Sequence, residues 1–389
     1  MRVLHAFKAY LPEVTGGVPH AISVLSGSMG PEIDSSVIAC SRGGQGGCVG
    51  VDGIAVKQVA SWGQLLSMPV APGFPLALKL AARQVDLVVA HLPFPLNDLG
   101  VALGLPRRVA LVVHWHSEIL GWRAFMPLLG SLIRNTLRRA DRIVVSDASM
   151  IANSCFLGPH VGKCSVVPFG TDVDYWENLH EEEWAQVKRL RRTYPRLIVA
   201  TGRLVSYKGF SVLIRALQDV DAMLVVIGEG PLRSALWKEA ERMQLTQRIL
   251  LKGFVPRDQL KIYLRAARVF AFPSVTPAET FGIAQIEAMA ASLPIVNTAL
   301  PTGVPKVARH GMEALTVPPN DPRALACAMG RLLDDAELAR RLGQAGLMRA
   351  RAEYDQEQFV SRMKCVYLEA QVARSQRFGS GAGANAGVV

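Results

Sequence analysis

The chain has 389 residues, of which 50% are hydrophobic and 19% are charged, so it can form two or three folded domains and is not disordered. Its 34 glycines and 23 prolines are too few for a collagen-like or low-complexity protein. The formal net charge of +11 predicts an anionic partner, which is a nucleic acid, an anionic lipid or a phosphorylated substrate. Most of the positive excess lies after residue 178.

Targeting and redox signals point to the cytosol. The longest uncharged stretch of the first half, residues 58–78, is interrupted by three prolines, so we predict no membrane span. The opening residues MRVLHAFKAYLP read as a strand rather than a signal peptide. The six cysteines form no CxxC pair, and their wide spacing predicts neither a zinc site nor a disulfide framework. We therefore expect a cytoplasmic protein with reduced thiols.

In the first half, short apolar runs alternate with amphipathic stretches. Val18, Ile22, Leu25 and Met29 have the spacing of a helix and follow the first predicted strand. Strands that are apolar on both faces and alternate with helices indicate a parallel sheet covered on both sides. The predicted strands are residues 3–7, 36–39, 86–91, 109–114 and 142–146.

The alternation breaks near residues 168–175 (PFGTDVDY) and then restarts, which predicts an α/β fold of two Rossmann-like domains with parallel sheets facing a cleft. The second set of strands is 197–201, 222–227, 249–253, 269–273, 294–297 and 315–318, with helices at 208–218, 231–243, 256–266, 282–291, 321–330 and 334–352. We assign residues 1–172 to an N-terminal domain, 173–352 to a C-terminal domain, 353–378 to a helix that packs back on the first domain, and 379–389 to a disordered tail.

Ligands of open α/β sheets bind beyond the carboxyl ends of the strands, and residues 278–292 (AETFGIAQIEAMAAS) follow one such strand. Glu279 precedes a helix that starts near Gly282, and Glu287 lies about 7–8 Å along it. The two carboxylates are spaced to bind the sugar and ribose hydroxyls of a nucleotide sugar, with the helix N-terminus facing the diphosphate. The alternative is a solvated helix with ordinary glutamates, although the apolar residues around Glu287 favour a packed one.

Two cations follow the strand at 197–201. Arg203 and Lys208, in ATGRLVSYKG, are suited to stabilise the leaving nucleoside diphosphate without a metal ion. The alternative is a routine pair of cations at the start of a helix.

Two glycine-rich turns are candidate phosphate sites. Gly16 and Gly17 connect the first strand to its helix, where a backbone without side chains approaches a phosphate closely. Residues 228–230 (GEG) fail the dinucleotide fingerprint because Arg233 occupies the position of its third glycine. A nicotinamide enzyme is therefore disfavoured.

Residues 112–118 (VVHWHSE) end a strand with two histidines at alternate positions, His114 and His116. A neutral imidazole there can bind a sugar hydroxyl, although a structural histidine is the more common case. His-x-His also suggests a metal, but no third ligand follows at a suitable spacing. Asp172 and Asp174 match the Asp-x-Asp of metal-dependent sugar transferases, but they lie where the alternation breaks and are assigned to the linker. We predict no metal and no cofactor.

Residues 121–140 combine apolar and basic side chains, including Trp122, Arg123, Arg134 and Arg138. Such a helix can lie in a lipid headgroup layer with its apolar face down, or can be a core helix with solvated arginines. Residues 62–80, rich in Trp, Phe, Met and Pro, are a candidate for a second lipid-facing loop.

Taken together, these segments resemble the retaining glycosyltransferases of family four, which have the two-domain GT-B fold. Within that family, the opening residues, VVHWHSE and NTALPTGVP resemble bacterial mannosyl- and rhamnosyl-transferases of O-antigen and exopolysaccharide assembly. The matching motifs occur in the family's order: GG at 16–17, WHSE at 115–118, PFGTD at 168–172, GRLVSYKG at 202–209, the pair Glu279 and Glu287, and PTGVPKVARHG at 301–311.

The resemblance implies roles for the second-half residues. Arg203 and Lys208 would hold the donor diphosphate, and Glu287 would bind the ribose hydroxyls. Glu279 would act as a catalytic residue that binds the transferred sugar. Backbone amides would lie near that sugar at Phe281, Gly282 and Ile283.

Other roles fall on both halves. His116 would lie beside the reacting sugar, and Gly16 and Gly17 would close over the phosphates. The nucleobase would contact the backbone around Phe254, in the sequence GFV. Relatives often have Asp where this chain has Glu118.

No acid in the first half stands out as a nucleophile, so we expect front-face attack in which the leaving diphosphate takes the acceptor proton. The expected donor is a GDP-linked mannose or 6-deoxyhexose such as rhamnose, and the expected acceptor a polyprenyl-diphosphate-linked saccharide. The enzyme would lie peripherally on the anionic inner face of the plasma membrane. An epimerase or phosphorylase of the same fold, and a non-catalytic anion-binding protein, remain alternatives. No nucleic-acid-binding fold is recognisable.

Overall fold

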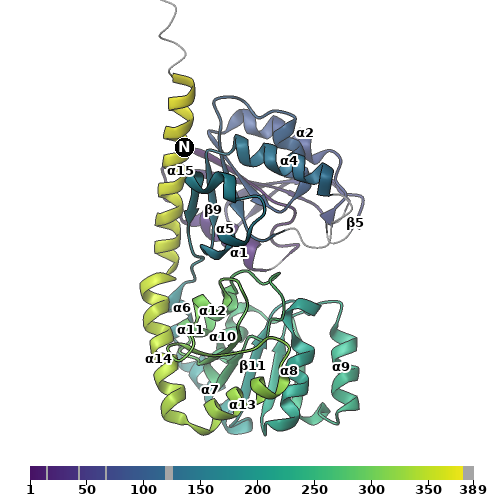
Figure 1. Cartoon of the computed structure of the whole chain (residues 1–389), viewed down its shortest axis with the longest axis vertical. Coiled ribbons are helices and arrows are strands. Elements are labelled where there is room, and N and C mark those ends of the chain that lie inside the picture. Colours follow the sequence, from purple (N-terminus) through teal and green to yellow (C-terminus); the bar gives the residue numbers. More distant parts are fainter. Residues whose placement is uncertain (15, 43, 66–67, 119–125, 380–389) are drawn as a thin grey trace, which may run out of the picture. The chain divides into compact units, whose positions relative to one another are not determined.

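The computed structural model describes residues 1–14, 16–42, 44–65, 68–118 and 126–379, and its contacts divide the chain into two units (Figure 1). Unit 1 contains Met1–Pro168 and Gln358–Val389, and unit 2 contains Phe169–Glu357. Residues 169–172, which the sequence analysis places in the first domain, belong to unit 2, because the Phe169 ring packs on Phe281 at 5.4 Å and the Thr171 hydroxyl accepts a hydrogen bond from Trp176.

Unit 1 is built on an eight-stranded sheet in which every neighbouring pair is parallel except β3 and β4. Along the sheet, the order is β10 (Cys164–Val166), β9 (Arg142–Val145), β8 (Ala110–Trp115), β7 (Leu87–Leu92), β1 (Arg2–Ala6), β2 (Asp34–Cys40), β4 (Ile54–Val59) and β3 (Gly47–Val51). The central strands β7 and β8 are buried at every residue, and β1 is buried apart from its first residue, as their continuous apolar runs predict.

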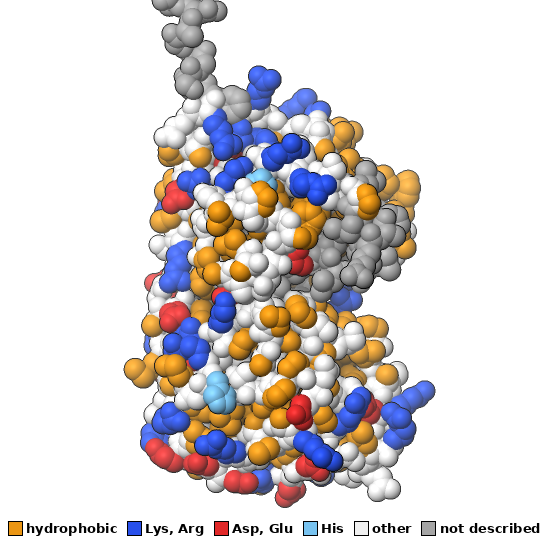
Figure 2. All heavy atoms as spheres, viewed as in Figure 1, with side chains coloured by type: hydrophobic (Ala, Val, Ile, Leu, Met, Phe, Trp, Pro, Cys, Tyr) orange, Lys and Arg blue, Asp and Glu red, His pale blue; other side chains and the backbone are white. Residues whose placement is uncertain are grey.

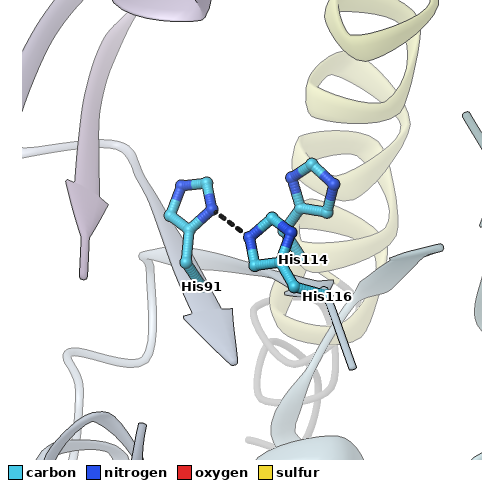
Figure 3. Close-up of side chains that lie close together, drawn as sticks. All are labelled: His91, His114 and His116. Carbon is cyan, nitrogen blue, oxygen red and sulfur yellow. Dashed lines mark hydrogen bonds between the residues drawn. The ribbon is translucent and has the colours of Figure 1, made fainter. Parts of the chain in front are cut away.

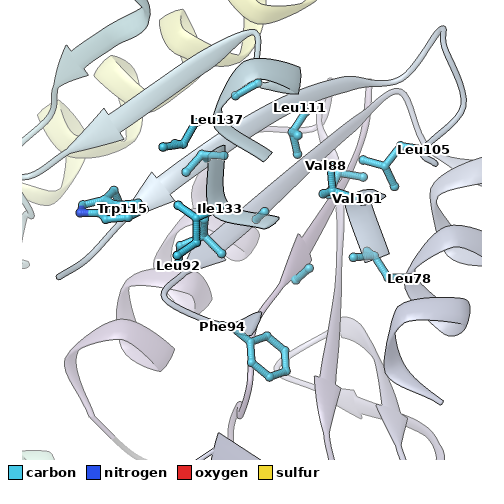
Figure 4. Close-up of a cluster of buried hydrophobic side chains, with 14 of the residues drawn as sticks. Leu78, Val88, Leu92, Phe94, Val101, Leu105, Leu111, Trp115, Ile133 and Leu137 are labelled. Carbon is cyan, nitrogen blue, oxygen red and sulfur yellow. The ribbon is translucent and has the colours of Figure 1, made fainter. Parts of the chain in front are cut away.

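Helices cover both faces of this sheet: α1 (Gly17–Ser28), α2 (Phe74–Ala81), α3 (Pro95–Ala102), α4 (Met126–Arg139), α5 (Ser149–Asn153) and α15 (Gln356–Gly379). The larger core lies between the sheet and α2, α3 and α4 (Figure 4). Along α15, Tyr367 is fully buried and Arg374 pairs with the buried Asp141 at 2.9 Å, so this helix is an integral part of unit 1.

The apolar face of α4 packs into this core and not against lipid. Leu129, Ile133 and Leu137 are buried, while Arg134 and Arg138 are exposed on the opposite side. Of the two alternatives in the sequence analysis, the described part of the helix is therefore a core helix with solvated arginines, since its apolar stripe packs on the sheet. Trp122 and Arg123 lie outside the described residues.

Residues 41–81 differ most from the expectations. The chain forms the hairpin β3–β4, a short pair β5 (Gln64–Leu65) and β6 (Met68–Pro69), and then α2. Phe74 and Leu78 of α2 are fully buried, so the second half of the segment 62–80 is a packed helix and not the predicted loop. Trp62 at 81% and Leu65 at 62% exposure remain on the surface.

Unit 2 is built on a six-stranded sheet of parallel strands. All six strands predicted here are confirmed, with ends that shift by at most two residues. Their order is β13 (Ile249–Gly253), β12 (Met223–Ile227), β11 (Leu197–Thr201), β14 (Val269–Ala271), β15 (Ile295–Thr298) and β16 (Ala314–Val317).

The helices of unit 2 are α6 (Val173–Glu177), α7 (Glu181–Thr193), α8 (Phe210–Ala216), α9 (Arg233–Arg242), α10 (Arg257–Ala266), α11 (Ile283–Ala290), α12 (Val304–Val307), α13 (Pro322–Asp334) and α14 (Ala336–Glu353). Asp172 caps α6 by accepting a hydrogen bond from the Tyr175 amide, and Asp174 pairs with Arg351 at 3.0 Å. The Asp-x-Asp sequence therefore has a structural role. Of the helices that the structure describes, none is both long and apolar enough to cross a bilayer.

Candidate active site

In unit 2 the loops that follow β11, β12, β13 and β14 leave the same edge of the sheet, since these strands are parallel neighbours. Arg203 follows β11, and Phe254 follows β13. Glu279 follows β14 and precedes α11. The topology therefore places the residues predicted from separate motifs at one edge.

An ion pair joins the loops after β11 and β14. The Lys208 Nζ lies 2.5 Å from the Glu279 Oε2, and the side chains are only 15% and 11% exposed. The Ser274 hydroxyl donates to the same carboxylate oxygen at 3.1 Å. Burial alone would lower the pKa of Lys208, but the attraction of Glu279 outweighs it and the pKa is raised. The pair is thus a fixed cation beside a fixed carboxylate.

Aromatic rings and a glycine surround the Lys208 ammonium. Its nitrogen lies 5.1 Å from the centre of the Phe272 ring and 5.7 Å from that of Tyr207, within the range of cation–π attraction. A Cβ on Gly202 would lie 3.4 Å from the Lys208 Cε, so the side chain runs along the end of β11. Arg203, which follows Gly202 in the chain, is exposed. The two predicted cations therefore occupy the same strand end, one paired and one facing solvent.

The glycines of the GEG sequence allow two loops to touch. A Cβ on Gly228 would lie 2.0 Å from the Gly202 carbonyl oxygen, and one on Gly230 would lie 2.4 Å from that of Leu204. The Leu204 amide also donates to the Glu229 carbonyl at 2.9 Å. A side chain at either glycine would prevent this backbone contact, which supports the loop that carries Arg203. The two glycines therefore have a packing role, although the segment does not match the dinucleotide-binding fingerprint.

The start of α11 is held from beneath by a polar network. Gly282 precedes the helix with φ +86°, and a Cβ there would lie 2.7 Å from the Phe272 ring. The Gln285 amide donates to the carbonyls of residues 281 and 304, and Asn297 donates to the Gln285 oxygen at 2.9 Å. The Phe281 ring is buried, so its proposed ligand contact is restricted to the backbone. The first amides of α11, including Ile283, have no intrahelical acceptor.

Glu287 lies half-buried in the middle of α11, and burial raises its pKa to about 7 while Arg257 acts in the opposite direction. The Arg257 guanidinium lies 4.3 Å from the Tyr175 ring centre and 5.1 Å from that of Trp176. The sequence analysis missed Arg257, because its local sequence VPRDQ looks like an ordinary helix start. Arg257 is the cation whose charge opposes the rise in the pKa of Glu287.

Phe254 is 62% exposed after β13, and its amide donates to the Glu229 Oε1 at 3.3 Å. Gly253 has φ +71°, and a Cβ there would lie 2.3 Å from the same Glu229 oxygen. The GFV segment is therefore shaped by Glu229, and the exposed ring of Phe254 is available to a ligand.

The residues predicted in unit 1 occupy two places. Gly16 is the exposed N-cap of α1, and a Cβ built on it would meet nothing within 4 Å, so the backbone of the helix start is open to approach. His116 follows β8 and is 9% exposed. Its Nε2 lies 2.9 Å from the Nδ1 of His91, and the dashed line in Figure 3 marks this hydrogen bond. Burial and the neighbouring His114 and Lys8 lower the pKa of His116 well below its ordinary value, so the imidazole is neutral.

His91 was missed as a partner of His116. A third ligand was sought along the sequence, whereas His91 comes from the neighbouring strand β7 and lies opposite His114 in the sheet register. The sequence did contain a signal for this partner, because the strand predicted at residues 86–91 ends on His91.

Two family models match the chain in succession. Residues 16–175 match Glycosyltransferase Family 4, and residues 181–349 match Glycosyl transferases group 1. The chain belongs to glycosyltransferase family four, a retaining family with the GT-B fold, and it is a glycosyltransferase that uses a nucleotide-sugar donor.

Among similar proteins, the D-rhamnosyltransferase WbpZ of Pseudomonas aeruginosa is 30% identical over 354 residues, which is 88% of this chain and 90% of the relative. The O-antigen chain mannosyltransferase C of Escherichia coli is 28% identical, over 88% and 92% of the two chains. A GDP-mannose-dependent phosphatidylinositol monomannoside mannosyltransferase of Mycolicibacterium smegmatis is 28% identical, over 62% and 64%. The solved sucrose-phosphate synthase of Thermosynechococcus elongatus has a TM-score of 0.79 at 20% identity, over 96% and 99%, which supports the fold alone.

Proposed function

We propose that the enzyme transfers mannose or a 6-deoxyhexose such as rhamnose from a GDP-linked donor to a lipid-linked saccharide during synthesis of a cell-surface polysaccharide. The observation that carries the donor site is the pairing of Lys208 with Glu279 at the edge where Arg203 is exposed. The names of the relatives support a mannose-like or rhamnose-like sugar and GDP as the nucleotide.

The donor-binding roles follow from the chemistry of each group. Arg203 and Lys208 would bind the diphosphate, and the amides at the start of α11 would complement its charge. Glu279 would accept hydrogen bonds from hydroxyls of the transferred sugar while its other side remains held by Lys208. Glu287 would bind the ribose hydroxyls. Roles for Gly16, Gly17 and His116 rest on the family resemblance.

The reaction we propose is a front-face substitution. The bond from the anomeric carbon to the diphosphate oxygen breaks, and both electrons remain on the diphosphate. The acceptor hydroxyl oxygen forms the new bond on the same face, and its proton passes to the leaving diphosphate. Fixed cations stabilise that leaving group more effectively than water would, since they need no reorganisation during the reaction.

The proposed acceptor is lipid-linked, so the enzyme would work peripherally at an anionic membrane. Support comes from unit 1, where basic side chains gather over the region of α4 (Figure 2). Arg134 and Arg138 are exposed there, and Leu76 and Leu80 of α2 are exposed at 56% and 46%. A surface with cations and isolated apolar groups suits a headgroup layer.

Purified enzyme incubated with GDP-mannose, GDP-rhamnose, UDP-glucose and ADP-glucose, each with a polyprenyl-diphosphate-linked saccharide, tests the proposal. We expect GDP release and a lengthened acceptor with one of the two GDP-sugars. Release from UDP-glucose or ADP-glucose alone would overturn the choice of donor. Conversion of the donor without any acceptor would indicate an epimerase, and a requirement for inorganic phosphate would indicate a phosphorylase.

A further inference from the structure

A pocket of about 470 Å³ opens on unit 1 where two neighbouring helices end. The chain leaves α2 and α3 toward the amino ends of the next strands, β7 and β8, and the pocket lies between these two connections. Three of the residues that line it are cations, namely Lys79, Arg83 and Arg108. We call it the basic pocket. It is distinct from the carboxyl ends of the strands, where His116 lies.

We propose that the basic pocket binds the phosphate of an anionic phospholipid headgroup, and that exposed leucines of α2 and α3 enter the same leaflet. This inference rests on the peripheral membrane placement proposed above, and it does not depend on the choice of sugar donor or acceptor. The volume of the pocket suits a phosphoglycerol headgroup, since sites for small molecules are typically about 300–1,000 Å³.

Backbone carbonyls hold two of the cations in place. The Lys79 Nζ donates to the Leu103 carbonyl at 2.8 Å, and the Arg108 guanidinium donates to the carbonyls of Arg83 and Val85. These bonds occupy carbonyls at the ends of the helices, which would otherwise repel an anion. Both side chains keep further N–H donors for a ligand, because an ammonium has three and a guanidinium has five.

Arg83 supplies a cation that faces solvent. Its side chain is exposed, and in the part of the chain that the structure describes no group pairs with its guanidinium. Asp86 contributes one negative charge, which is shared between Arg108 at 4.0 Å and Arg2 at 3.9 Å. Arg107, beside Arg108, is also exposed. The pocket therefore keeps a net positive charge, which is complementary to a phosphate.

Exposed leucines lie on the two helices that lead to the basic pocket. Leu76 and Leu80 of α2, and Leu99 and Leu103 of α3, are between 39% and 56% exposed. The members of each pair are four residues apart and so share one face of their helix. The two helices are in close contact, since a Cβ on Gly100 of α3 would lie 2.8 Å from a side chain of α2.

The combination of a basic pocket with exposed leucines favours a lipid over the other anionic partners. Side chains of this kind suit the boundary between the headgroups and the acyl chains of a leaflet, where cations meet phosphates and leucines leave water. A nucleic acid or a free phosphate would bind the cations but would leave the leucines in water.

Co-sedimentation of the full-length protein with vesicles of phosphatidylcholine, with and without phosphatidylglycerol, tests the basic pocket. We expect binding only to vesicles that contain phosphatidylglycerol. Arg83→Gln should weaken it at least tenfold, which exceeds the loss of about fivefold expected for one charge near an anionic surface. Leu80→Ser should weaken it severalfold, because less apolar surface enters the leaflet.

Two matched controls should bind these vesicles as the wild type does. Arg242→Gln removes an exposed arginine of unit 2, and Leu368→Ser removes a leucine of α15 that is 49% exposed. Equal losses in Arg83→Gln and Arg242→Gln would mean that the attraction has no defined site, which would overturn the proposal.

Titration with glycerol 3-phosphate and with random-sequence DNA, both without vesicles, distinguishes the other partners. We expect both to bind more weakly than the vesicles. Tight binding of glycerol 3-phosphate with unchanged vesicle binding by Arg83→Gln would identify a soluble anion as the occupant, and preference for DNA would identify a nucleic acid. Either result would overturn the proposal. Failure of the proposed function is seen separately, as an absence of sugar transfer by a protein whose vesicle binding still depends on Arg83.

Discussion

The two sheets place different chemistry at the same kind of edge. In unit 2 the loops at the carboxyl ends of the strands bring together opposite charges, with Lys208 and Glu279 in direct contact. In unit 1 the corresponding ends of β1, β7 and β8 bear histidines that burial keeps neutral. The same kind of sheet edge therefore carries a buried ion pair in unit 2 and uncharged, hydrogen-bonded imidazoles in unit 1.

The free-energy cost of losing a side chain differs between the two sheet edges. A buried ion pair keeps its charges only while both partners are present, so the loss of one leaves an uncompensated charge. Neutral imidazoles carry a smaller desolvation penalty and can exchange hydrogen-bond direction without moving atoms. We therefore expect substitutions at the unit 2 edge to have the larger consequences, and the following experiments measure that difference.

The largest effect is expected for the ion pair. Lys208→Met and Glu279→Gln should each lower turnover about a thousandfold, because a fixed charge at the leaving group or sugar is lost. Lys208→Met should also lower the free energy of unfolding by about 3 kcal/mol, since Glu279 is left buried alone. Steady-state kinetics and urea unfolding measure the two changes.

A matched control separates the site from burial in general. Glu239 of α9 is as buried as Glu279, at 8% exposure for each residue, and pairs with Arg215 at 2.9 Å. Glu239→Gln should therefore destabilise the protein without lowering turnover. An equal loss of turnover in Glu239→Gln would mean that the effect of Glu279→Gln is only structural.

The next largest effect is expected for the packed glycine after β12. Gly228→Ala should lower the free energy of unfolding by about 3 kcal/mol, because its Cβ would meet the Gly202 carbonyl at 2.0 Å and φ is +139°. Gly104→Ala in unit 1 is the control, with φ +95° and nothing within 4 Å, and should cost only about 1 kcal/mol. Equal costs in thermal unfolding would disprove the close loop contact.

Glu287 should show a trade-off between stability and binding. Its pKa is raised from 4.5 to about 7, so the folded protein holds a proton that the unfolded chain releases. The stability from this group is fully present below pH 4.5 and is lost as the pH rises through about 7. Glu287→Gln should therefore raise the free energy of unfolding at pH 8 by roughly 2–3 kcal/mol, and weaken nucleotide binding about tenfold.

Melting temperatures of wild type and Glu287→Gln between pH 4 and pH 8 measure this trade-off. The two curves should lie close together at pH 4 and separate toward pH 8. Curves that remain parallel over the whole range would show that Glu287 keeps its ordinary pKa.

The smallest effect is expected at the basic surface of unit 1. Arg134→Gln and Arg138→Gln should each weaken binding to phosphatidylglycerol vesicles by about 1 kcal/mol, with the loss reduced at high salt. Arg340→Gln in unit 2, where the arginine pairs with Glu337, should leave vesicle binding unchanged. Vesicle co-sedimentation provides the measurement. Equal losses of vesicle binding in all three variants would show that binding is not specific to the basic surface of unit 1.

Regular elements were predictable where a short apolar run was bounded by polar residues, as for β11 and β13, whose bounds agree with the prediction. The hairpin β3–β4 was missed because the first four residues of β3 are exposed, so this strand lacks the apolar pattern that marks the buried strands. The α4 stripe was ambiguous because a core and a lipid layer select the same helical spacing.

The sequence places the candidate residues at strand ends of one sheet, but it does not predict how they contact one another. Glu279, Lys208 and Glu287 were identified from their chemistry, but nothing local to the sequence shows that Lys208 and Glu279 form a pair or that Glu287 is partly protonated at neutral pH. His91 and Arg257 were missed because their neighbours are distant in sequence and adjacent only through the fold. Pairing across strands is a tertiary property.

Calorimetric titration of wild type and Lys208→Met with GDP, UDP and ADP tests the central claim, that the unit 2 edge binds the nucleoside diphosphate part of the donor. We predict that GDP binds most tightly to the wild type and that Lys208→Met weakens it at least a hundredfold. Equal affinity of the two proteins for GDP, or no binding of any of the three nucleotides by the wild type, would contradict the account.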